Sequence, residues 1–332
     1  GGLDTLANSS ASLGGTVRTS GDQIDLGAVT LVGNATVETN FGVATGAAIN
    51  FTSTVTADNA ATQDRTLTVN AGTTGDVTFS NTVGVTQKLA ELDVTGLAIN
   101  LNGASIFVDD DNAAAATSTF TGAVVLGANV TIDGDKSAND SSISFTSTIN
   151  ADNSTTQARS LTLTGGTGSI TVSGNIGSGA NGQLDGGLTI SGGAINLQAI
   201  TTSGGAATEN AGLVNIDGSG AVTIAGTITA LGNTTGNGGA IDIDATGTNT
   251  ISVQAINASG VLSASTSADE TEQVKQGAVE SVPTPGETAP PAGPPAESFA
   301  PFAESTKPSS STAELRAAAS KPAPGVQPGA FS

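Results

Sequence analysis

Histidine and cysteine are both absent from this chain of 332 residues, and so are methionine, tryptophan and tyrosine. Without histidine or cysteine the chain cannot form a Ser-His-Asp triad, a cysteine nucleophile, or a zinc site built on these side chains. It also cannot form a disulfide, so it is not a small domain held together by cross-links. The lack of tryptophan and tyrosine removes the aromatic platforms that sugar-cleaving clefts usually offer.

Basic residues are scarce, with 9 lysines and arginines against 29 aspartates and glutamates, and the formal net charge is −20. Such a surface repels phosphate backbones, so nucleic acid is not an expected partner. No apolar run approaches the ~20 residues of a membrane helix, and no transmembrane segment is predicted. The first residues, GGLDTLANSS, lack the features of a signal peptide, which predicts a cytoplasmic chain or the mature or excised part of a secreted one.

Proline is missing from most of the chain, because all 11 prolines lie between Pro283 and Pro328. Residues 1–262 are rich in Gly, Thr, Ala, Asn, Val and Ile and can bury a sizeable aliphatic core. Residues 263–332 are rich in Pro, Ala, Ser and Glu, and contain too few apolar groups to offset the entropy lost on ordering. We therefore predict an acidic tail or linker over 263–332, extended where the prolines cluster.

A long internal repeat dominates the part before the prolines. The segment NFTSTVTADNAATQDRTLTVNAG, residues 50–72, recurs 94 residues later as SFTSTINADNSTTQARSLTLTGG. Between Phe51–Val69 and Phe145–Leu163, 12 of 19 positions are identical. Similar matches continue on both sides, so residues 24–118 and 119–213 are two copies of one unit, and 214–262 resembles part of a third.

A shorter period lies inside this unit. Short runs of alternating apolar and polar residues, separated by Gly, Asn, Asp and Ser, return about every 25 residues with three runs in each period. Such alternation predicts strands with one buried face. The last members of the series that open each period are Leu161-Thr-Leu163, Leu188-Thr-Ile190, Val214-Asn-Ile216 and Ile241-Asp-Ile243.

Three strands per period predict an all-β fold, a parallel β-helix of about ten coils in which each coil adds one strand to each of three sheets. We expect the β-solenoid over residues 24–262, with 1–23 as a lead-in or cap. Leu161, Leu163, Ile170, Val172 and Ile176 should point into one core. An antiparallel sandwich also has short strands separated by turns, but it does not predict about ten returns to one apolar pattern.

The stretches SLTLTGGTGSITVSGNI, RTLTVNAGTTGDVTFSNTV and TFTGAVVLGANVTIDG resemble the repeats of large bacterial surface exoproteins, the filamentous-haemagglutinin-like adhesins and related repeat-rich secreted proteins. The resemblance covers about residues 20–260 and lies in the style of the repeat, without a catalytic signature. It implies a secreted, right-handed parallel β-helix that serves adhesion, matrix or fibre construction. This chain is shorter than such proteins and lacks their amino-terminal secretion domain, which suggests a fragment or processed product.

Clustered carboxylates are the remaining source of chemistry. The densest run, Asp109-Asp110-Asp111, is a candidate Ca²⁺ site, although it lacks the spaced pattern of known calcium loops, and an acidic turn is the default interpretation. Asp133 with Asp135, and Asp242 with Asp244, are candidate pairs for polysaccharide cleavage, because glycosidases need two carboxylates. Asp242 and Asp244 should share one face of a strand. The plainer interpretation of these acids is a solvated strand face or loop.

The predicted function is structural: a non-enzymatic, secreted or surface-exposed subunit or fragment of a fibre, sheath or adhesin, with a cell-surface or glycan receptor as a further expected partner. The alternative is a carboxylate-dependent polysaccharide lyase or hydrolase on the same scaffold. Self-association is expected, because a solenoid ends in strands with unpaired backbone groups. Phe299, Phe302 and Phe331 in the tail are candidate anchors for docking on a partner, and no cofactor other than Ca²⁺ is considered.

Overall fold

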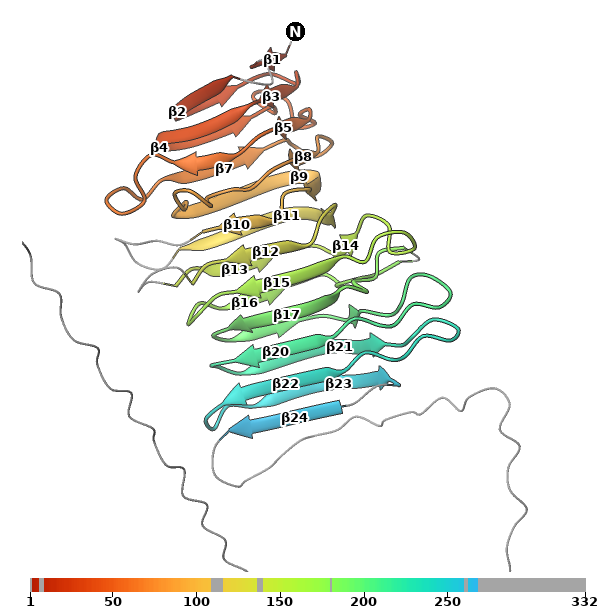
Figure 1. Cartoon of the computed structure of the whole chain (residues 1–332). Coiled ribbons are helices and arrows are strands. Elements are labelled where there is room, and N and C mark those ends of the chain that lie inside the picture. The colour runs from red at the N-terminus through yellow and green to blue at the C-terminus, as the bar shows by residue number, and fades with distance from the viewer. Residues whose placement is uncertain are drawn as a thin grey trace, which may run out of the picture. The chain divides into compact units, whose positions relative to one another are not determined.

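The structure, a computed structural model, describes residues 2–5, 9–108, 116–135, 140–179 and 181–259, together with the backbone of residues 262–267. These residues form 24 β-strands, and no helix occurs among them. The strand pairs are parallel and stack as the coils of a β-solenoid, which confirms the predicted fold class (Figure 1).

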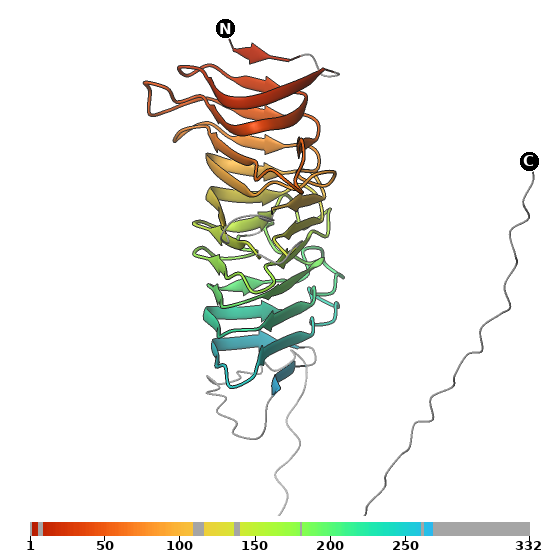
Figure 2. The ribbon, with the colours of Figure 1, turned by 90° about the vertical axis from the view of Figure 1, so that its left-hand side faces the viewer.

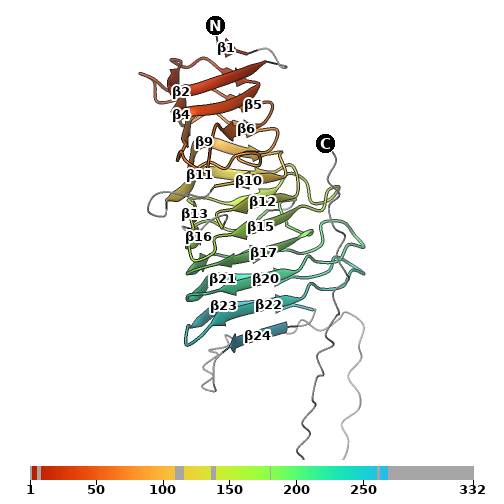
Figure 3. The same ribbon diagram turned by 60° about the vertical axis from the view of Figure 1, so that its left-hand side comes forward.

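Three sheets run along the solenoid, and the chain visits them in the order I, II, III in every coil. Sheet I contains β1 (Leu3–Asp4), β3 (Ile24–Leu26), β5 (Ile49–Phe51), β8 (Val77–Phe79), β14 (Ile149–Ala151) and β19 (Ile200–Thr201). Sheet II contains β6 (Val55–Ala57), β10 (Ser105–Phe107), β12 (Val130–Asp133), β15 (Ser160–Thr164), β17 (Gly187–Gly192), β20 (Val214–Gly218), β22 (Ile241–Thr246) and β24 (Leu262–Ser267) (Figure 3). Sheet III contains β7 (Thr66–Asn70), β13 (Ser142–Phe145), β16 (Ile170–Val172) and β18 (Ile195–Leu197).

Six longer strands bend round a corner of the coil and so belong to two sheets. Of these, β2 (Ser10–Arg18) and β4 (Ala28–Glu38) join sheets II and III. The other four join sheets III and I: β9 (Glu91–Leu101), β11 (Thr117–Leu126), β21 (Val222–Ala230) and β23 (Ile251–Ala258). The corner between sheets III and I therefore has no loop in these coils, whereas sheets I and II are connected by loops.

One column of stacked side chains counts the coils. In sheet I, beyond the pairing of Leu3 with Ile24, ten residues from Ile24 onward are register partners in successive coils, so they span nine turns of the chain, and their spacing matches the predicted period (Figure 2). At about 4.8 Å per coil the column is roughly 43 Å long. Its members are Ile24, Ile49, Val77, Ile99, Val124, Ile149, Ile176, Ile200, Ile228 and Ile256.

Alternation along each strand explains which residues make the core. In β15 the side chains of Leu161 and Leu163 are buried, and Thr162 between them faces outward. The side chains predicted to share a core are confirmed, since Ile170, Val172 and Ile176 are also at most 1% exposed. Because parallel register places like residues above one another, the interior becomes columns of Ile, Leu and Val, while Thr, Asn and Asp form ladders outside.

The two copies of the long repeat occupy different sheets. Phe51 of the first copy lies in sheet I and stacks on Phe79, with ring centroids 4.9 Å apart. Its counterpart Phe145 lies in sheet III and stacks on Phe120 at 4.8 Å. Between Phe51 and Phe145 the chain completes three coils and passes two further sheets. The 94-residue repeat is therefore not a whole number of coils, and its second copy is turned by one face.

A glycine is required where β11 turns from sheet III into sheet I. Gly122 has a φ of 141°, and the register of β11 against β9 shifts beside it, between Thr121 and Ala123. A Cβ on Gly122 would lie 2.1 Å from the carbonyl oxygen of Gly96 in the neighbouring coil. The corner can thus pack at the spacing of the coils only without a side chain at this position.

Strand pairing extends beyond the range predicted for the solenoid. At the amino-terminal end β1 pairs with β3 and β2 with β4, so residues before 24 already follow the coil. At the other end β24 pairs with β22 up to Ser267. The prolines and the rest of the predicted tail, residues 268–332, lie outside the described residues.

Candidate functional site

Two sets of predicted site residues cannot be placed. Asp109, Asp110 and Asp111 lie outside the described residues, as do Phe299, Phe302 and Phe331, and their roles stay predictions. Within the described ranges, no group of three or more acidic, histidine or cysteine side chains is arranged to hold a metal ion. Over the same ranges, no helix is long and apolar enough to cross a membrane.

The pair Asp133 and Asp135 lies where β12 leaves sheet II. Asp133 is 8% exposed, and its Oδ1 accepts a hydrogen bond of 2.9 Å from the backbone N–H of Asp135. This bond spans two residues and closes a local turn. The carboxylate of Asp133 is therefore engaged with its own loop and is largely buried, unlike the solvated acid of the plainer interpretation.

The pair Asp242 and Asp244 shares the outer face of β22, as predicted from alternation. Asp244 is the register partner of Asp217 in β20, one coil away. Asp217 and Asp244 line a surface groove of about 420 Å³ beside sheet II, whose other lining residues are small or polar. The side-chain amide of Asn215 donates a 2.9 Å hydrogen bond to Oδ2 of Asp217. The orientation of the Asp217 carboxylate is therefore fixed by a residue of the same strand, β20.

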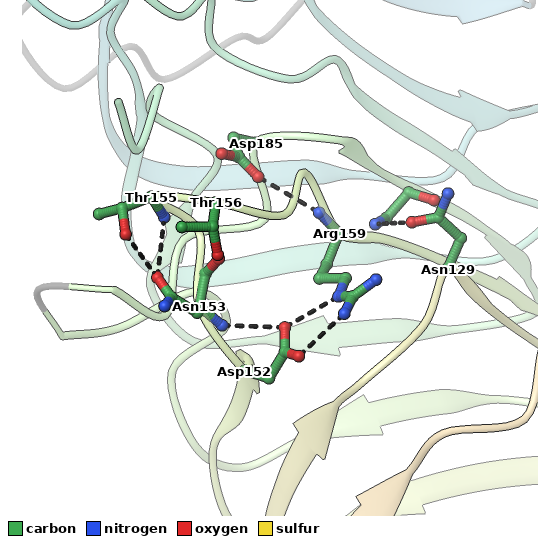
Figure 4. Close-up of polar contacts among 8 residues, drawn as sticks. Asn129, Asp152, Asn153, Thr155, Thr156, Arg159 and Asp185 are labelled. Atoms are coloured by element: carbon green, nitrogen blue, oxygen red, sulfur yellow. Dashed lines mark hydrogen bonds and ion pairs between the residues drawn. The ribbon is translucent and has the colours of Figure 1, made fainter. Parts of the chain in front are cut away.

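The most regular polar feature of the molecule is an ion pair that occurs once in each copy of the repeat. In the first copy, Nε and Nη2 of Arg65 donate to the two carboxylate oxygens of Asp58 at 2.8 and 2.9 Å. In the second copy, Arg159 binds Asp152 in the same way, at 2.8 Å for both bonds (Figure 4). Two parallel bonds fix the planes of both groups, so each pair clasps the loop between its two residues.

Each clasp shifts the protonation equilibria of its partners. The Arg159 guanidinium holds the pKa of the Asp152 carboxyl below its usual value, and Asp152 in turn raises the pKa of Arg159. The first-copy pair shows the same directions for the same cause. Because both pairs are at the surface, solvent screens them, and their role is to shape the loops more than to stabilise the fold.

A second conserved feature of the two copies ties each clasped loop to the preceding coil. Oδ1 of Asn34 accepts a hydrogen bond of 3.2 Å from the backbone N–H of Thr66, and Oδ1 of Asn129 accepts one of 3.1 Å from Ser160 (Figure 4). These asparagines precede their loops by about one coil. The two copies of the repeat therefore share both the clasped loop and the asparagine contact that joins this loop to the preceding coil.

The second clasp belongs to a stack of four loops that connect sheet I to sheet II in successive coils. These loops project on the same side of the solenoid in Figure 1. Backbone hydrogen bonds join the first loop to the second, from Ser154 N–H to the Asn181 carbonyl at 2.9 Å, and the third to the fourth, from Gly204 N–H to the Leu231 carbonyl at 3.0 Å. The second loop is bonded to the end of β19, just before the third loop, where Leu184 N–H donates to the Thr201 carbonyl at 3.1 Å. The four loops span residues 152–159, 177–186, 202–213 and 231–240.

Two carboxyl groups meet inside this stack, and the sequence alone did not single them out. Asp185, in the second loop, is 7% exposed, and its Oδ1 accepts a hydrogen bond of 3.3 Å from the backbone N–H of Arg159 (Figure 4). Its other oxygen is buried and has no hydrogen-bond partner. Burial, followed by the Glu209 carboxylate of the third loop, raises the pKa of Asp185 to about 6.

Comparison of the two copies reveals why Asp185 stands apart. Leu89 and Leu184 both donate their backbone N–H to a strand of the next coil, and Ala90 and Gly186 both donate to the carbonyl of the clasp arginine. In the first copy Leu89 and Ala90 are adjacent, whereas Asp185 separates Leu184 from Gly186. The signal in the sequence was the insertion of Asp185 directly after the buried Leu184. This insertion can be recognised only when the two loops are aligned by their matching hydrogen bonds.

The loop stack and the groove offer different chemistry. The Asp185 carboxyl is enclosed by the loops, and Glu209 beside it is partly exposed. The groove at Asp217 and Asp244 is open to solvent and offers two carboxylates one coil apart. Comparison of the chain with models of protein families, with curated protein sequences and with solved structures found no match.

Proposed function

We propose that this chain is a non-enzymatic structural or adhesive protein of the extracellular space or cell surface, a subunit or fragment of a fibre, sheath or adhesin. The observation that supports this most directly is the parallel pairing of successive coils over nine turns, which repeats outward polar residues along one axis. Such a stack is stiff, because each coil is held by backbone hydrogen bonds to its neighbours. A stiff rod with a repeating face is what fibre construction and multivalent adhesion require.

The outer face of sheet II supplies the surface for a receptor in this proposal. Threonine occupies three successive rungs there, at Thr131, Thr162 and Thr189, and Asn215 and Asp242 follow in the same column. Hydroxyl, amide and carboxylate groups at a spacing of about 4.8 Å can bond to the hydroxyls of an extended glycan at several points at once. A cell-surface or other glycan is therefore the receptor class we propose.

Binding of the purified full-length chain to a glycan array and to cells tests this function. We expect binding that weakens when Thr162 and Thr189 are both replaced by lysine, since the longer side chains cover the face without reaching the core. The matched control is a double lysine variant at Thr68 and Thr78, which lie outside sheet II. Equal binding by the two variants, or no binding by the parent, contradicts the proposal.

A second candidate, polysaccharide cleavage, rests on the groove. Carboxylates on adjacent coils stand about 4.8 Å apart at the backbone, close to the separation of roughly 5 to 5.5 Å in retaining glycosidases. The groove residues supply Asp217 and Asp244 and no basic group, so hydrolysis suits them better than a lyase reaction that needs a base. Release of reducing sugar from acidic and neutral polysaccharides, abolished in both Asp217→Asn and Asp244→Asn, would favour the enzyme.

Self-association and Ca²⁺ binding complete the proposal. Among the described strands β2 pairs only with β4 and β24 only with β22, which leaves one edge of each terminal coil as a template for another chain. Contact of one end with the other does not close on itself and would give filaments. For Ca²⁺, the ligands would be Asp109, Asp110 and Asp111, and a melting temperature that Ca²⁺ raises in the parent but not in the triple asparagine variant would establish the site.

A further inference from the structure

The carboxyl group of Asp185 is in an unusual electrostatic position. It is almost fully buried between loops 177–186 and 202–213, and one of its oxygens lacks any hydrogen-bond donor. Burying a carboxylate oxygen without a donor costs free energy, and burying it beside a second negative charge costs more. A structure that keeps this arrangement needs something positive at the orphaned oxygen.

Glu209 stands opposite and is itself held in place. Its Oε2 accepts a hydrogen bond of 2.9 Å from the backbone N–H of Ala206, within the same loop. The backbone N–H of Glu209 donates to the carbonyl of Ala206 at 3.0 Å, and its carbonyl accepts from Asn233 N–H at 3.0 Å. The backbone of Glu209 is therefore anchored in the third and the fourth loop, and its carboxyl group is held by the N–H of Ala206.

The other charged groups near Asp185 do not neutralise it. Arg159 contributes its backbone N–H to Asp185, whereas its guanidinium binds Asp152 through Nε and Nη2 at 2.8 Å. The remaining neighbours that act on the pKa of the Asp185 carboxyl oppose each other: Glu209 raises it, and the backbone of Gly205 lowers it by a smaller amount. Glu209 is thus the group whose charge Asp185 must accommodate, and a proton held between the two carboxyls satisfies the orphaned oxygen.

We propose that Asp185 and Glu209 share one proton, and that this proton is a pH-sensitive latch between two loops of adjacent coils. With the proton in place, one carboxyl donates to the other and the loops are joined by a hydrogen bond. Without it, the buried negative charge of Asp185 faces that of the partly exposed Glu209, and the two repel each other. The matched position of the first copy has no inserted acid, so the device belongs to the second copy alone.

The direction of the pH dependence follows from the pKa. Burial and the neighbouring Glu209 raise the pKa of Asp185 from 3.8 to about 6 in the folded chain. A folded pKa above the unfolded one means that the folded state binds the proton more tightly. The stabilisation is complete below the unfolded value and is lost as the pH rises through about 6. The loops are therefore held together in acid and loosened at neutral pH.

Hydrogen–deuterium exchange of the full-length chain tests the latch. After correction for the intrinsic rates, protection of amides in residues 202–213 should fall about tenfold between about pH 5 and pH 7, the ratio set by a group titrating midway. Residues 84–91, the matched loop of the first copy, should keep constant protection and serve as the internal reference. Constant protection in both loops overturns the proposal.

Two variants separate the shared proton from other causes. Asp185→Asn and Glu209→Gln each replace one carboxyl by an amide that donates to the remaining one, so both should show pH-independent protection. Asp4→Asn removes an exposed acid at the far end of the solenoid and should keep the parent's pH dependence. If the two amide variants retain the pH dependence, another group is responsible and the latch is refuted.

A divalent cation is the rival occupant of the same gap. Millimolar Ca²⁺ at about pH 7.5 should leave the protection of residues 202–213 unchanged if a proton is the natural occupant. Ca²⁺-dependent protection in the parent that is lost in Asp185→Asn would overturn the proton latch in favour of a metal site. Should the variants fail to fold, a carbon-detected NMR titration of the parent's carboxyl groups decides the matter: a midpoint near 4 for Asp185 contradicts the proposal.

Discussion

At the scale of single residues, the fold depends on a strict separation between inward and outward positions. Leu163 is 0% exposed, whereas Thr162, its neighbour in β15, faces outward. Leu163 lies between Ile132 and Ile190 in its column, so its surroundings on both sides are apolar. A charge there would have neither water nor a partner.

Leu163→Asp should lower the free energy of unfolding by about 3 to 5 kcal/mol, because it buries an unpaired carboxylate. Thr162→Asp is the matched control, since it places the same group on the outer face of the same strand, where the effect should stay below about 1 kcal/mol. Chemical denaturation of both variants measures the difference. Equal midpoints for the two would contradict the assignment of faces.

The two Asp–Arg clasps contribute to the stability of the fold, and this contribution changes with pH in the direction opposite to that of the Asp185–Glu209 latch. Because Arg159 lowers the pKa of Asp152 in the folded chain, the pair stabilises above the unfolded value of 3.8, and this is lost as the pH falls through the folded pKa. Asp152→Asn should therefore be slightly less stable than the parent at neutral pH, by under about 1 kcal/mol. The difference should vanish in strong acid.

Thermal melting across the acid range checks this prediction, and Asp58→Asn in the first copy is the matched variant, for which the same direction is expected. A difference between parent and Asp152→Asn that persists unchanged in strong acid would show that the pair acts through packing and not through charge.

At the scale of elements, the corners decide whether one coil can follow the next. Strands β9, β11, β21 and β23 cross from sheet III into sheet I without a loop, and the crossing brings backbones of adjacent coils together. Gly122 stands at such a crossing, close to Gly96 of the previous coil. Gly15 of β2 has a comparable backbone conformation, with a φ of 104°, but a Cβ there would meet no atom within 4 Å.

Gly122→Ala should destabilise the solenoid more than Gly15→Ala. Both substitutions place a side chain on a backbone with positive φ, at a cost of about 1 to 2 kcal/mol. Gly122→Ala adds a collision with backbone that cannot move aside without separating two coils. Denaturation midpoints compare the two variants directly, and an equal loss would show that the corner tolerates a methyl group.

At the scale of the whole molecule, the solenoid gives the proposed fibre its axis, and the tail is the part proposed to dock on a neighbour. A terminal coil with an unpaired edge favours addition of another strand. Phe299, Phe302 and Phe331 would provide aromatic anchors for such a contact in a tail that is otherwise rich in Pro, Ala, Ser and Glu.

Deletion of residues 275–332 should reduce assembly, because it removes all three phenylalanines and keeps every described strand. Light scattering of the parent and the truncated chain over a range of concentrations measures the mass of each. A variant with the three phenylalanines changed to serine separates loss of the anchors from loss of length. A parent that stays monomeric at high concentration, or a truncated chain that assembles equally, contradicts the proposal.

Much of the architecture could be predicted from the chain because its evidence is local. Alternation in runs such as Leu161-Thr-Leu163 defines a strand and its buried face, and the return of such runs about every 25 residues defines the coil. The absence of proline before Pro283 is consistent with strands that all donate their N–H groups. None of these inferences needs to know which residue lies next to which in space.

The tertiary structure decided three things that the sequence did not show. It placed Phe51 and Phe145 in different sheets, because the number of coils between them depends on the lengths of all the intervening turns. It brought Asp217 and Asp244 together at one groove. It also enclosed Asp185 beside Glu209, where burial and like charge change the chemistry of an ordinary carboxyl group. The strands and their period depend on residues that are close in the sequence. Contacts between residues of different coils depend on the lengths of all the turns between them, which fix the register of each coil on the next.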